Sequence, residues 1–163
     1  MKKNKEKKLS AHFKKIKMLA CDFDGVMTDN NVIIDENGKE SVVCNRADSL
    51  GIELLSERGI DVVVISKETN KVVKARCDKL NIQCVQGTDD KLPILKKEAI
   101  KRNLMQENIC FIGNDINDIG CIRYAGLGIA VNDSHPSVKK AANFITKKKG
   151  GYGAVREIAD LIL

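Results

Sequence analysis

The sequence predicts an α/β protein whose mostly parallel sheet is covered by helices on both faces. Short apolar runs alternate along the chain with segments of about ten residues that place apolar side chains at helical spacing. The chain has 163 residues, of which 43% are hydrophobic and 31% are charged. That length and composition are typical of one globular domain.

Each predicted strand is a short apolar run bounded by polar residues or glycine. The run Asp-Val-Val-Val-Ile at residues 61–65 is rich in β-branched residues, which favour a buried strand. In chain order, the runs that predict the strands of the sheet cover residues 16–21, 61–65, 82–85, 108–112, 128–131 and 144–145.

Each predicted helix repeats apolar side chains every three or four residues. In the first of them Leu50 and Leu54 lie one turn apart, and Gly59 follows as a candidate C-terminal cap. The predicted helices cover residues 47–58, 70–80, 90–102, 116–125, 136–142 and 155–163. Because helices separate the strands, the strands should run parallel, and ligands should bind at their carboxyl ends.

A β-hairpin is predicted at residues 31–44, because Asn37-Gly38 between two short apolar runs is a strong turn signal. Residues 16–163 then form one domain. The first 17 residues hold eight Lys and one Glu, so the rest of the chain is close to neutral although the net charge is +6. We expect residues 1–15 to form a disordered, basic tail; an arm for nucleic acid or a membrane surface is the alternative.

Composition also excludes several classes of function. Aromatic residues make up 4% of the chain and Trp is absent, which argues against binding nucleic acid by base stacking. No apolar run approaches the ~18 residues of a membrane span. The six cysteines form no Cys-x-x-Cys pair and no export signal is visible, so we expect reduced thiols and a cytoplasmic protein.

Polar side chains follow two of the predicted strands directly. Asp22 and Asp24 come after the first strand, where two carboxylates can converge on a cation while one serves as nucleophile and the other moves protons. Gly25 would let the backbone approach a phosphate. After the strand at 108–112, Asn114, Asp115 and Asp118 offer oxygen ligands that suit Mg²⁺. A helix cap with an acidic first turn is the alternative for this second cluster.

Two further residues complete a phosphate site. Ser66 ends the strand at 61–65, and Lys91 opens the helix at 90–102. A hydroxyl and an ammonium group are suitable partners for phosphoryl oxygens beside a metal. Alone, each would be a helix cap or a solvated charge. Their order along one α/β chain, together with the two acidic clusters, makes the pattern specific.

That order resembles the haloacid dehalogenase superfamily, over residues 16–163. The absence of a cap domain, the hairpin after the first motif and the sequence Gly-Gly-Tyr-Gly-Ala-Val-Arg-Glu at 150–157 resemble its small capless branch. That branch includes octulosonate 8-phosphate phosphatases and the phosphatase-like domains of some acylneuraminate cytidylyltransferases. The resemblance implies a Rossmann-like core, four subunits assembled through their hairpins, and a Gly-Gly-x-Gly segment that approaches a neighbour's active site.

The resemblance also implies roles for the motif residues. Asp22 would be the nucleophile and a ligand of Mg²⁺, and Asp24 the general acid and base whose backbone carbonyl also binds the metal. Ser66 and Lys91 would hold the phosphoryl oxygens. The chain departs from the family at Asn114, where an Asp is usual; Asp115 or Asp118 would then compensate for the missing charge near the metal.

The expected substrate is the phosphate ester of a 2-keto-3-deoxy sugar acid. Glu68 stands where the octulosonate branch carries Arg, and with Lys79 or Arg76 it resembles the branch that acts on nine-carbon sugar acids; Arg156 would reach a neighbour's site. The sequence thus favours a nonulosonate 9-phosphate of sialic-acid type. The alternatives are 3-deoxy-D-manno-octulosonate 8-phosphate, a catalytically weak structural domain, and a phosphoacceptor receiver domain. Neither nucleic acid nor a membrane is an expected partner.

Overall fold

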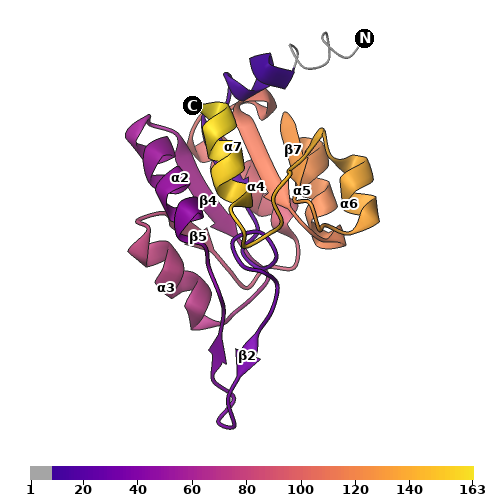
Figure 1. Ribbon diagram of the computed structural model, residues 1–163. Helices are drawn as coiled ribbons and strands as arrows, with labels where there is room; N and C mark the ends of the chain where they lie inside the picture. The colour runs from indigo at the N-terminus through magenta and orange to yellow at the C-terminus, as the bar shows by residue number, and fades with distance from the viewer. Residues whose placement is uncertain (1–8) are drawn as a thin grey trace.

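The computed structural model describes residues 9–163 and contains a six-stranded parallel sheet (Figure 1). The strand order is β5-β4-β1-β6-β7-β8. The strands are β1 (Met18–Cys21), β4 (Asp61–Ile65), β5 (Gln83–Val85), β6 (Ile109–Gly113), β7 (Leu127–Ala130) and β8 (Phe144–Ile145). Every neighbouring pair in this sheet is parallel. The predicted α/β class is therefore confirmed.

Helices cover both faces of the sheet. They are α2 (Arg46–Glu57), α3 (Lys71–Lys79), α4 (Lys91–Lys101), α5 (Ile119–Tyr124), α6 (Pro136–Ala141) and α7 (Ala154–Ile162). Two short 3₁₀ turns, η1 (Gln106–Asn108) and η2 (Ile116–Asp118), precede β6 and α5. The segment predicted as one helix at 116–125 thus consists of η2 followed by α5. The side chain of Asp115 caps the start of η2.

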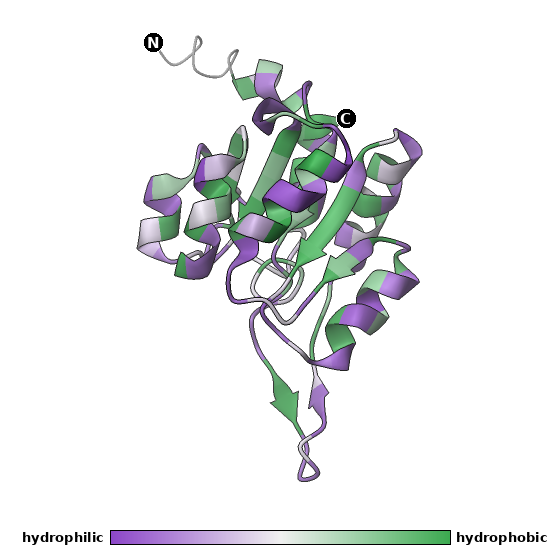
Figure 2. Ribbon diagram, turned by 180° about the vertical axis from the view of Figure 1, so that it is seen from behind, coloured by the Kyte–Doolittle hydropathy of each residue, from purple (hydrophilic) through white to green (hydrophobic). Residues whose placement is uncertain are grey.

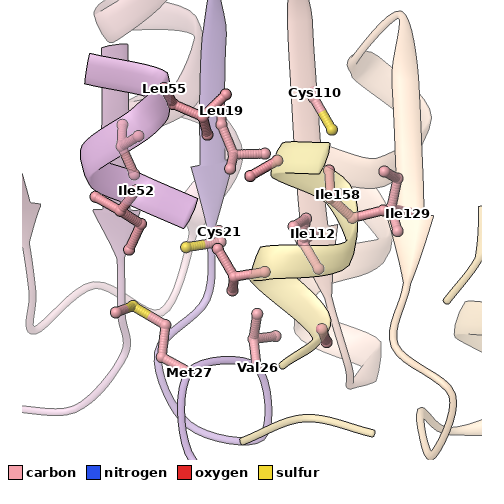
Figure 3. Close-up of a cluster of buried hydrophobic side chains, with 14 of the residues drawn as sticks. Leu19, Cys21, Val26, Met27, Ile52, Leu55, Cys110, Ile112, Ile129 and Ile158 are labelled. Atoms are coloured by element: carbon pink, nitrogen blue, oxygen red, sulfur yellow. The ribbon is translucent and has the colours of Figure 1, made fainter. Parts of the chain in front are cut away.

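The alternation of side chains along β1 divides the core into two clusters. Leu19 and Cys21 pack with residues of α2, α3 and α7, including Ile52 and Ile158 (Figure 3). Met18 and Ala20 face the opposite side, with residues of α4, α5 and α6. Strand residues buried on both faces are expected for a parallel sheet between two helix layers. Figure 2 shows hydrophobic strands between helices whose surfaces are partly hydrophilic.

The hairpin predicted at 31–44 is present as β2 (Ile33–Ile34) and β3 (Glu40–Ser41), which pair antiparallel. It extends away from the sheet at the end where the catalytic motifs lie (Figure 1). Its apolar side chains are exposed, with Ile33 at 60% and Ile34 at 63%. A hydrophobic strand that buries nothing within its own chain is a candidate contact surface.

The predicted tail needs a correction. Residues 1–8 lie outside the described part of the chain, but residues 9–13 are helical rather than disordered. Phe13 is buried and its ring packs edge-on against Phe144, with 5.9 Å between the ring centroids. An apolar residue within the basic run therefore fixes part of the segment to the core. No helix within residues 9–163 is long and apolar enough to cross a membrane, and the six cysteines are free thiols.

Asp48 in α2 joins that helix to α7. Its side chain is buried, and Oδ1 accepts a hydrogen bond of 2.8 Å from the backbone N–H of Arg156 in the first turn of α7. A carboxylate at a helix N-terminus is stabilised by the free N–H groups there. Its other oxygen, Oδ2, is buried and has no hydrogen-bond partner within residues 9–163. Burial raises the pKa of Asp48 to about 6.

We predict that Asp48→Asn flattens the pH dependence of stability between pH 4 and 6. Because the folded-state pKa lies above the ordinary 3.8, the contribution of Asp48 is fully present below about pH 4 and is lost as the pH rises through 6. A pKa shift of two units corresponds to a change of about 2.7 kcal/mol in the free energy of unfolding. Urea unfolding of both proteins at several pH values measures the difference. A constant difference across this window would contradict the prediction.

Candidate active site

Asp22 and Asp24 lie in the loop that follows β1, at the carboxyl edge of the sheet. Asp22 is 7% exposed, and its backbone N–H donates to Ile112 O at 3.0 Å, which continues the pairing with β6. Its Oδ1 accepts a hydrogen bond of 2.7 Å from the backbone N–H of Phe23. The loop then turns sharply: the backbone N–H groups of Met27 and Thr28 both donate to Phe23 O. This turn brings Asp24 to the same cavity as Asp22.

Lys91, the first residue of α4, is fully buried between two carboxylates. Its Nζ lies 2.7 Å from Asp22 Oδ2 and 2.8 Å from Asp118 Oδ1. Asp118 Oδ2 accepts the backbone N–H groups of Asn114 at 2.9 Å and Asp115 at 3.3 Å. Both oxygens of Asp118 are therefore engaged within the protein. These contacts place Asp118 where it positions Lys91 and the loop after β6, and its predicted role as a metal ligand stays a prediction.

Burial and charge shift the pKa values of these groups. Burial, reinforced by the negative charge of Asp118, raises the pKa of Asp22 to about 7, against the lowering effect of Lys91. Burial alone would lower the pKa of Lys91, but Asp22 and Asp118 raise it above its usual value. The ammonium group thus stays charged. Burial, together with the nearby Glu68, also raises the pKa of Asp24, which favours a carboxyl group that can donate a proton.

Ser66 follows β4 and is 1% exposed. Its backbone N–H donates to Val85 O at 2.9 Å, and its Oγ accepts the backbone N–H of Glu68 at 3.1 Å. Ser66 and Asp22 line the same cavity. We call the space between these loops the catalytic cavity. It has a volume of about 150 Å³ and is lined by Asp22, Asp24, Asn30, Ser66, Lys67, Glu68, Asn114, Asp115 and Asn117.

Three of these lining residues were not predicted. Asn30 adopts a left-handed backbone conformation (φ 67°) in the loop before the hairpin. Lys67 and Asn117 are direct neighbours in sequence of predicted site residues. Asn117 lies in the polar cluster after β6, which was the signal that could have found it. Asn30 carries no such signal, because its place in the cavity depends on the turn of the chain after β1.

The oxygen atoms around Asp22 fit a magnesium ion. Asn114 Oδ1 is buried and has no hydrogen-bond partner within residues 9–163. With the Asp22 carboxylate and the Asp24 backbone carbonyl, this amide oxygen makes a set of hard ligands of the kind that Mg²⁺ prefers. No group of three His, Cys, Asp or Glu side chains in the described part of the chain could hold a metal. A site here therefore depends on the amide and the carbonyl oxygens.

Gly25 is required for this arrangement. It has a φ of +75°, and a Cβ built on it would lie 2.0 Å from Asn114 Nδ2. Any side chain at position 25 would displace Asn114. Gly150 packs against the same loop from the other side, because its Cβ would lie 1.8 Å from Gly25 O. The Gly-Gly-x-Gly segment thus supports the catalytic loop of its own chain, and a phosphate contact by Gly25 stays a prediction.

Three predicted substrate residues do not line the catalytic cavity. Arg76 points from α3 to α2, where its guanidinium group donates to Ser49 Oγ. Lys79 is exposed at the end of α3. Arg156 Nε donates to Asp160 Oδ1 at 2.7 Å. Glu68 does line the cavity, as does Asp115, whose Oδ1 caps the backbone N–H of Ile116 at 2.7 Å.

Asn114→Asp should tighten Mg²⁺ binding by about tenfold, because a carboxylate adds a full negative charge at the position of the unpartnered amide oxygen. Titration with Mg²⁺ measures the dissociation constant. Asn117→Asp is the matched control, since it adds the same charge to the same cavity at another position. Equal tightening by the two variants would show that Asn114 is not a ligand.

Known proteins share this fold and these motifs. A family model for haloacid dehalogenase-like hydrolases matches residues 65–158. The 3-deoxy-D-manno-octulosonate 8-phosphate phosphatase KdsC of Yersinia pestis is 37% identical over 149 residues, which cover 91% of this chain and 80% of that protein. The KdsC protein of Escherichia coli K12 is 35% identical over 149 residues, with 91% and 79% covered.

Solved structures agree closely with this one. The 3-deoxy-D-manno-octulosonate 8-phosphate phosphatase of Moraxella catarrhalis, in complex with magnesium, phosphate and KDO, superposes with a TM-score of 0.93 at 34% identity, covering 96% of this chain and 90% of that one. A subfamily III A protein from Legionella pneumophila superposes with a TM-score of 0.98 at 36% identity, covering 99% and 90%. This chain therefore belongs to the haloacid dehalogenase-like hydrolases, in their capless branch, and is a phosphatase.

Proposed function

We propose that this protein is a Mg²⁺-dependent phosphatase of 2-keto-3-deoxy sugar acid phosphates, with 3-deoxy-D-manno-octulosonate 8-phosphate as its preferred substrate. The observation that carries the proposal is the buried pairing of Asp22 with Lys91 beside the unpartnered oxygen of Asn114. Relatives that are named for this ester align with more than nine-tenths of the chain, and their names support the choice of substrate.

The residues of the catalytic cavity support a two-step reaction. Asp22 attacks the phosphorus atom, a bond forms between its carboxylate oxygen and phosphorus, and the ester O–P bond breaks. Asp24 donates its proton to the leaving alcohol oxygen. Asp24 then accepts a proton from the water that attacks the aspartyl-phosphate, which releases inorganic phosphate and restores Asp22. Lys91 and Ser66 bind phosphoryl oxygens, and Mg²⁺ when bound neutralises charge on the transferring group.

The substrate differs from the one that the sequence favours. The preference for a nine-carbon acid rested on Glu68 together with Arg76 or Lys79, and only Glu68 lines the catalytic cavity. Arg76 is directed to α2 and Lys79 to solvent. The two curated relatives and the Moraxella catarrhalis structure carry the name of the eight-carbon ester. The nonulosonate 9-phosphate remains the second candidate, because an acidic Glu68 can accept hydrogen bonds from a hydroxyl or acylamino group.

Steady-state hydrolysis of the two esters in the presence of Mg²⁺ tests the choice. We expect a higher kcat/KM for 3-deoxy-D-manno-octulosonate 8-phosphate than for a nonulosonate 9-phosphate. The reverse order would support the nine-carbon assignment and make Glu68 its determinant. A folded protein that releases phosphate from neither ester would support the structural-domain alternative.

We also infer a homotetramer in which the hairpins form the contacts. The exposed apolar side chains of Ile33 and Ile34, together with Val32 and Val43, support this assembly. A molar mass of four subunits by light scattering is the expected result. The free thiols of all six cysteines support a reducing, cytoplasmic location.

A further inference from the structure

A second cavity adjoins the catalytic cavity and lies between the hairpin and the start of α3. We call it the hairpin cavity; its volume is about 190 Å³. Asp24, Asn30 and Glu68 line both cavities, so the two spaces are continuous at the general acid. In the proposed reaction the alcohol oxygen leaves toward Asp24. The carbon atoms attached to that oxygen therefore start at the boundary between the two cavities.

The walls of the hairpin cavity have the chemistry of a sugar-binding site. Valine side chains from the hairpin and from α3 supply apolar surface for C–H groups, while Asn30, Asn70 and Glu40 supply polar atoms. No Lys or Arg of the described chain lines this cavity. A substrate carboxylate placed here would face Glu40 and Glu68 without a compensating cation, which is unfavourable. Within one chain, the cavity therefore suits hydroxyl groups better than an acid group.

Asn70 fixes the carboxylate of Glu40 in the wall of this cavity. Asn70 Nδ2 donates to Glu40 Oε2 at 2.6 Å, which ties β3 of the hairpin to the N-terminus of α3. Asn70 Oδ1 in turn accepts the backbone N–H of Val72 at 3.0 Å. Gln86, which follows β5, fixes the backbone of residues 68–70. Its Nε2 donates to Asn70 O at 3.0 Å and to Glu68 O at 3.2 Å. Val72 and Gln86 thus position Asn70, and Asn70 positions Glu40.

One oxygen of Glu40 remains available. Oε2 is occupied by Asn70, whereas Oε1 has no hydrogen-bond or ion-pair partner within residues 9–163. A carboxylate held at one oxygen and free at the other is a preorganised acceptor for a hydroxyl group. Glu40 does not line the catalytic cavity, so its main effect should fall on the binding of the sugar.

We propose that the hairpin cavity binds the hydroxylated carbon chain next to the phosphate, with Glu40 as a specificity-determining residue. This inference rests on the proposed function, because it assumes a polyhydroxylated leaving group. It assigns an orientation: hydroxyl groups near the phosphate enter the hairpin cavity and face Glu40, while the carboxylate of the sugar acid lies beyond this cavity.

Two measurements on Glu40→Ala test the proposal, with Glu36→Ala as the matched control. Glu36 is an exposed carboxylate in the turn of the same hairpin. For 3-deoxy-D-manno-octulosonate 8-phosphate, E40A should raise KM about tenfold while kcat changes less than about threefold, the effect of one lost hydrogen bond to substrate. The dissociation constant of free 3-deoxy-D-manno-octulosonate, measured by calorimetry, should rise at least about fivefold. E36A should change neither.

Glu40→Gln separates the contact with Asn70 from the recognition of the sugar. Gln has a single acceptor oxygen, which the Nδ2–H group of Asn70 occupies, so E40Q keeps that contact but presents an NH₂ donor in place of Oε1. Its KM should therefore remain above that of the wild type. Equal KM and dissociation constants for E40A and E36A would overturn the proposal, as would a wild-type protein that does not bind the free sugar acid. Glu40-dependent binding without hydrolysis would refute the proposed function but support the hairpin cavity as the sugar site.

Discussion

Lys91→Met is expected to destabilise the protein by about 3–5 kcal/mol and to lower phosphate release by more than about 10²-fold. The ammonium group lies 2.7 Å from Asp22 and 2.8 Å from Asp118, and the side chain is fully buried. Its removal leaves two buried carboxylates without a cation. In the proposed reaction, the same change removes the positive charge that binds phosphoryl oxygens. Urea unfolding and a phosphate-release assay measure the two effects.

Lys97→Met is the control for this variant, because Lys97 lies exposed on the same helix. The destabilisation by K91M should also be smaller at pH 5 than at pH 8. Burial already raises the pKa of Asp22 to about 7, and without Lys91 the carboxyl group takes up a proton more readily as the pH falls. K91M and K97M proteins of equal stability at pH 8 would show that Lys91 does not hold the two carboxylates.

Asp22→Asn should lower phosphate release by more than about 10³-fold without loss of stability. An amide cannot replace the carboxylate as nucleophile. The substitution also removes one of two like charges in a buried site, and Lys91 keeps its contact with Asp118. The D22N protein should therefore unfold at a urea concentration equal to or above that of the wild type.

Asp35→Asn is the matched control for D22N. This variant makes the same acid-to-amide change at an exposed position in the hairpin turn. There Asp35 Oδ1 accepts hydrogen bonds from the backbone N–H groups of Asn37 and Lys39. This variant should keep wild-type turnover. Residual turnover by D22N above a hundredth of the wild-type rate would mean that another group attacks the phosphorus atom.

Much of the fold follows from local patterns. The apolar runs that predict strands 16–21 and 61–65 contain β1 and β4, and Asn37-Gly38 lies in the turn of the observed hairpin. The helical segment at 9–13 was not predicted, because the lysines on both sides of it led us to assign residues 1–15 to a disordered tail. The burial of Phe13 depends on Phe144, which is distant in sequence, and no local pattern contains this contact.

The gathering of the candidate site residues could be predicted because parallel strands bring the residues after their carboxyl ends to one edge. Asp22, Ser66 and Asn114 meet there for this reason, whatever the details of packing. The ion pair between Asp118 and Lys91 could not be predicted, since it depends on how α4 packs beside η2. The contact of Arg76 with Ser49 could not be predicted either, because it depends on the rotational position of Arg76 on α3, which spacing alone does not give.

The most direct test of the account is phosphate release from 3-deoxy-D-manno-octulosonate 8-phosphate by the wild-type protein, with Mg²⁺ and with a chelator. The account predicts turnover that requires Mg²⁺ and that the D22N variant loses. Turnover that is unchanged by the chelator, or no turnover by a folded protein with Mg²⁺ present, would contradict it.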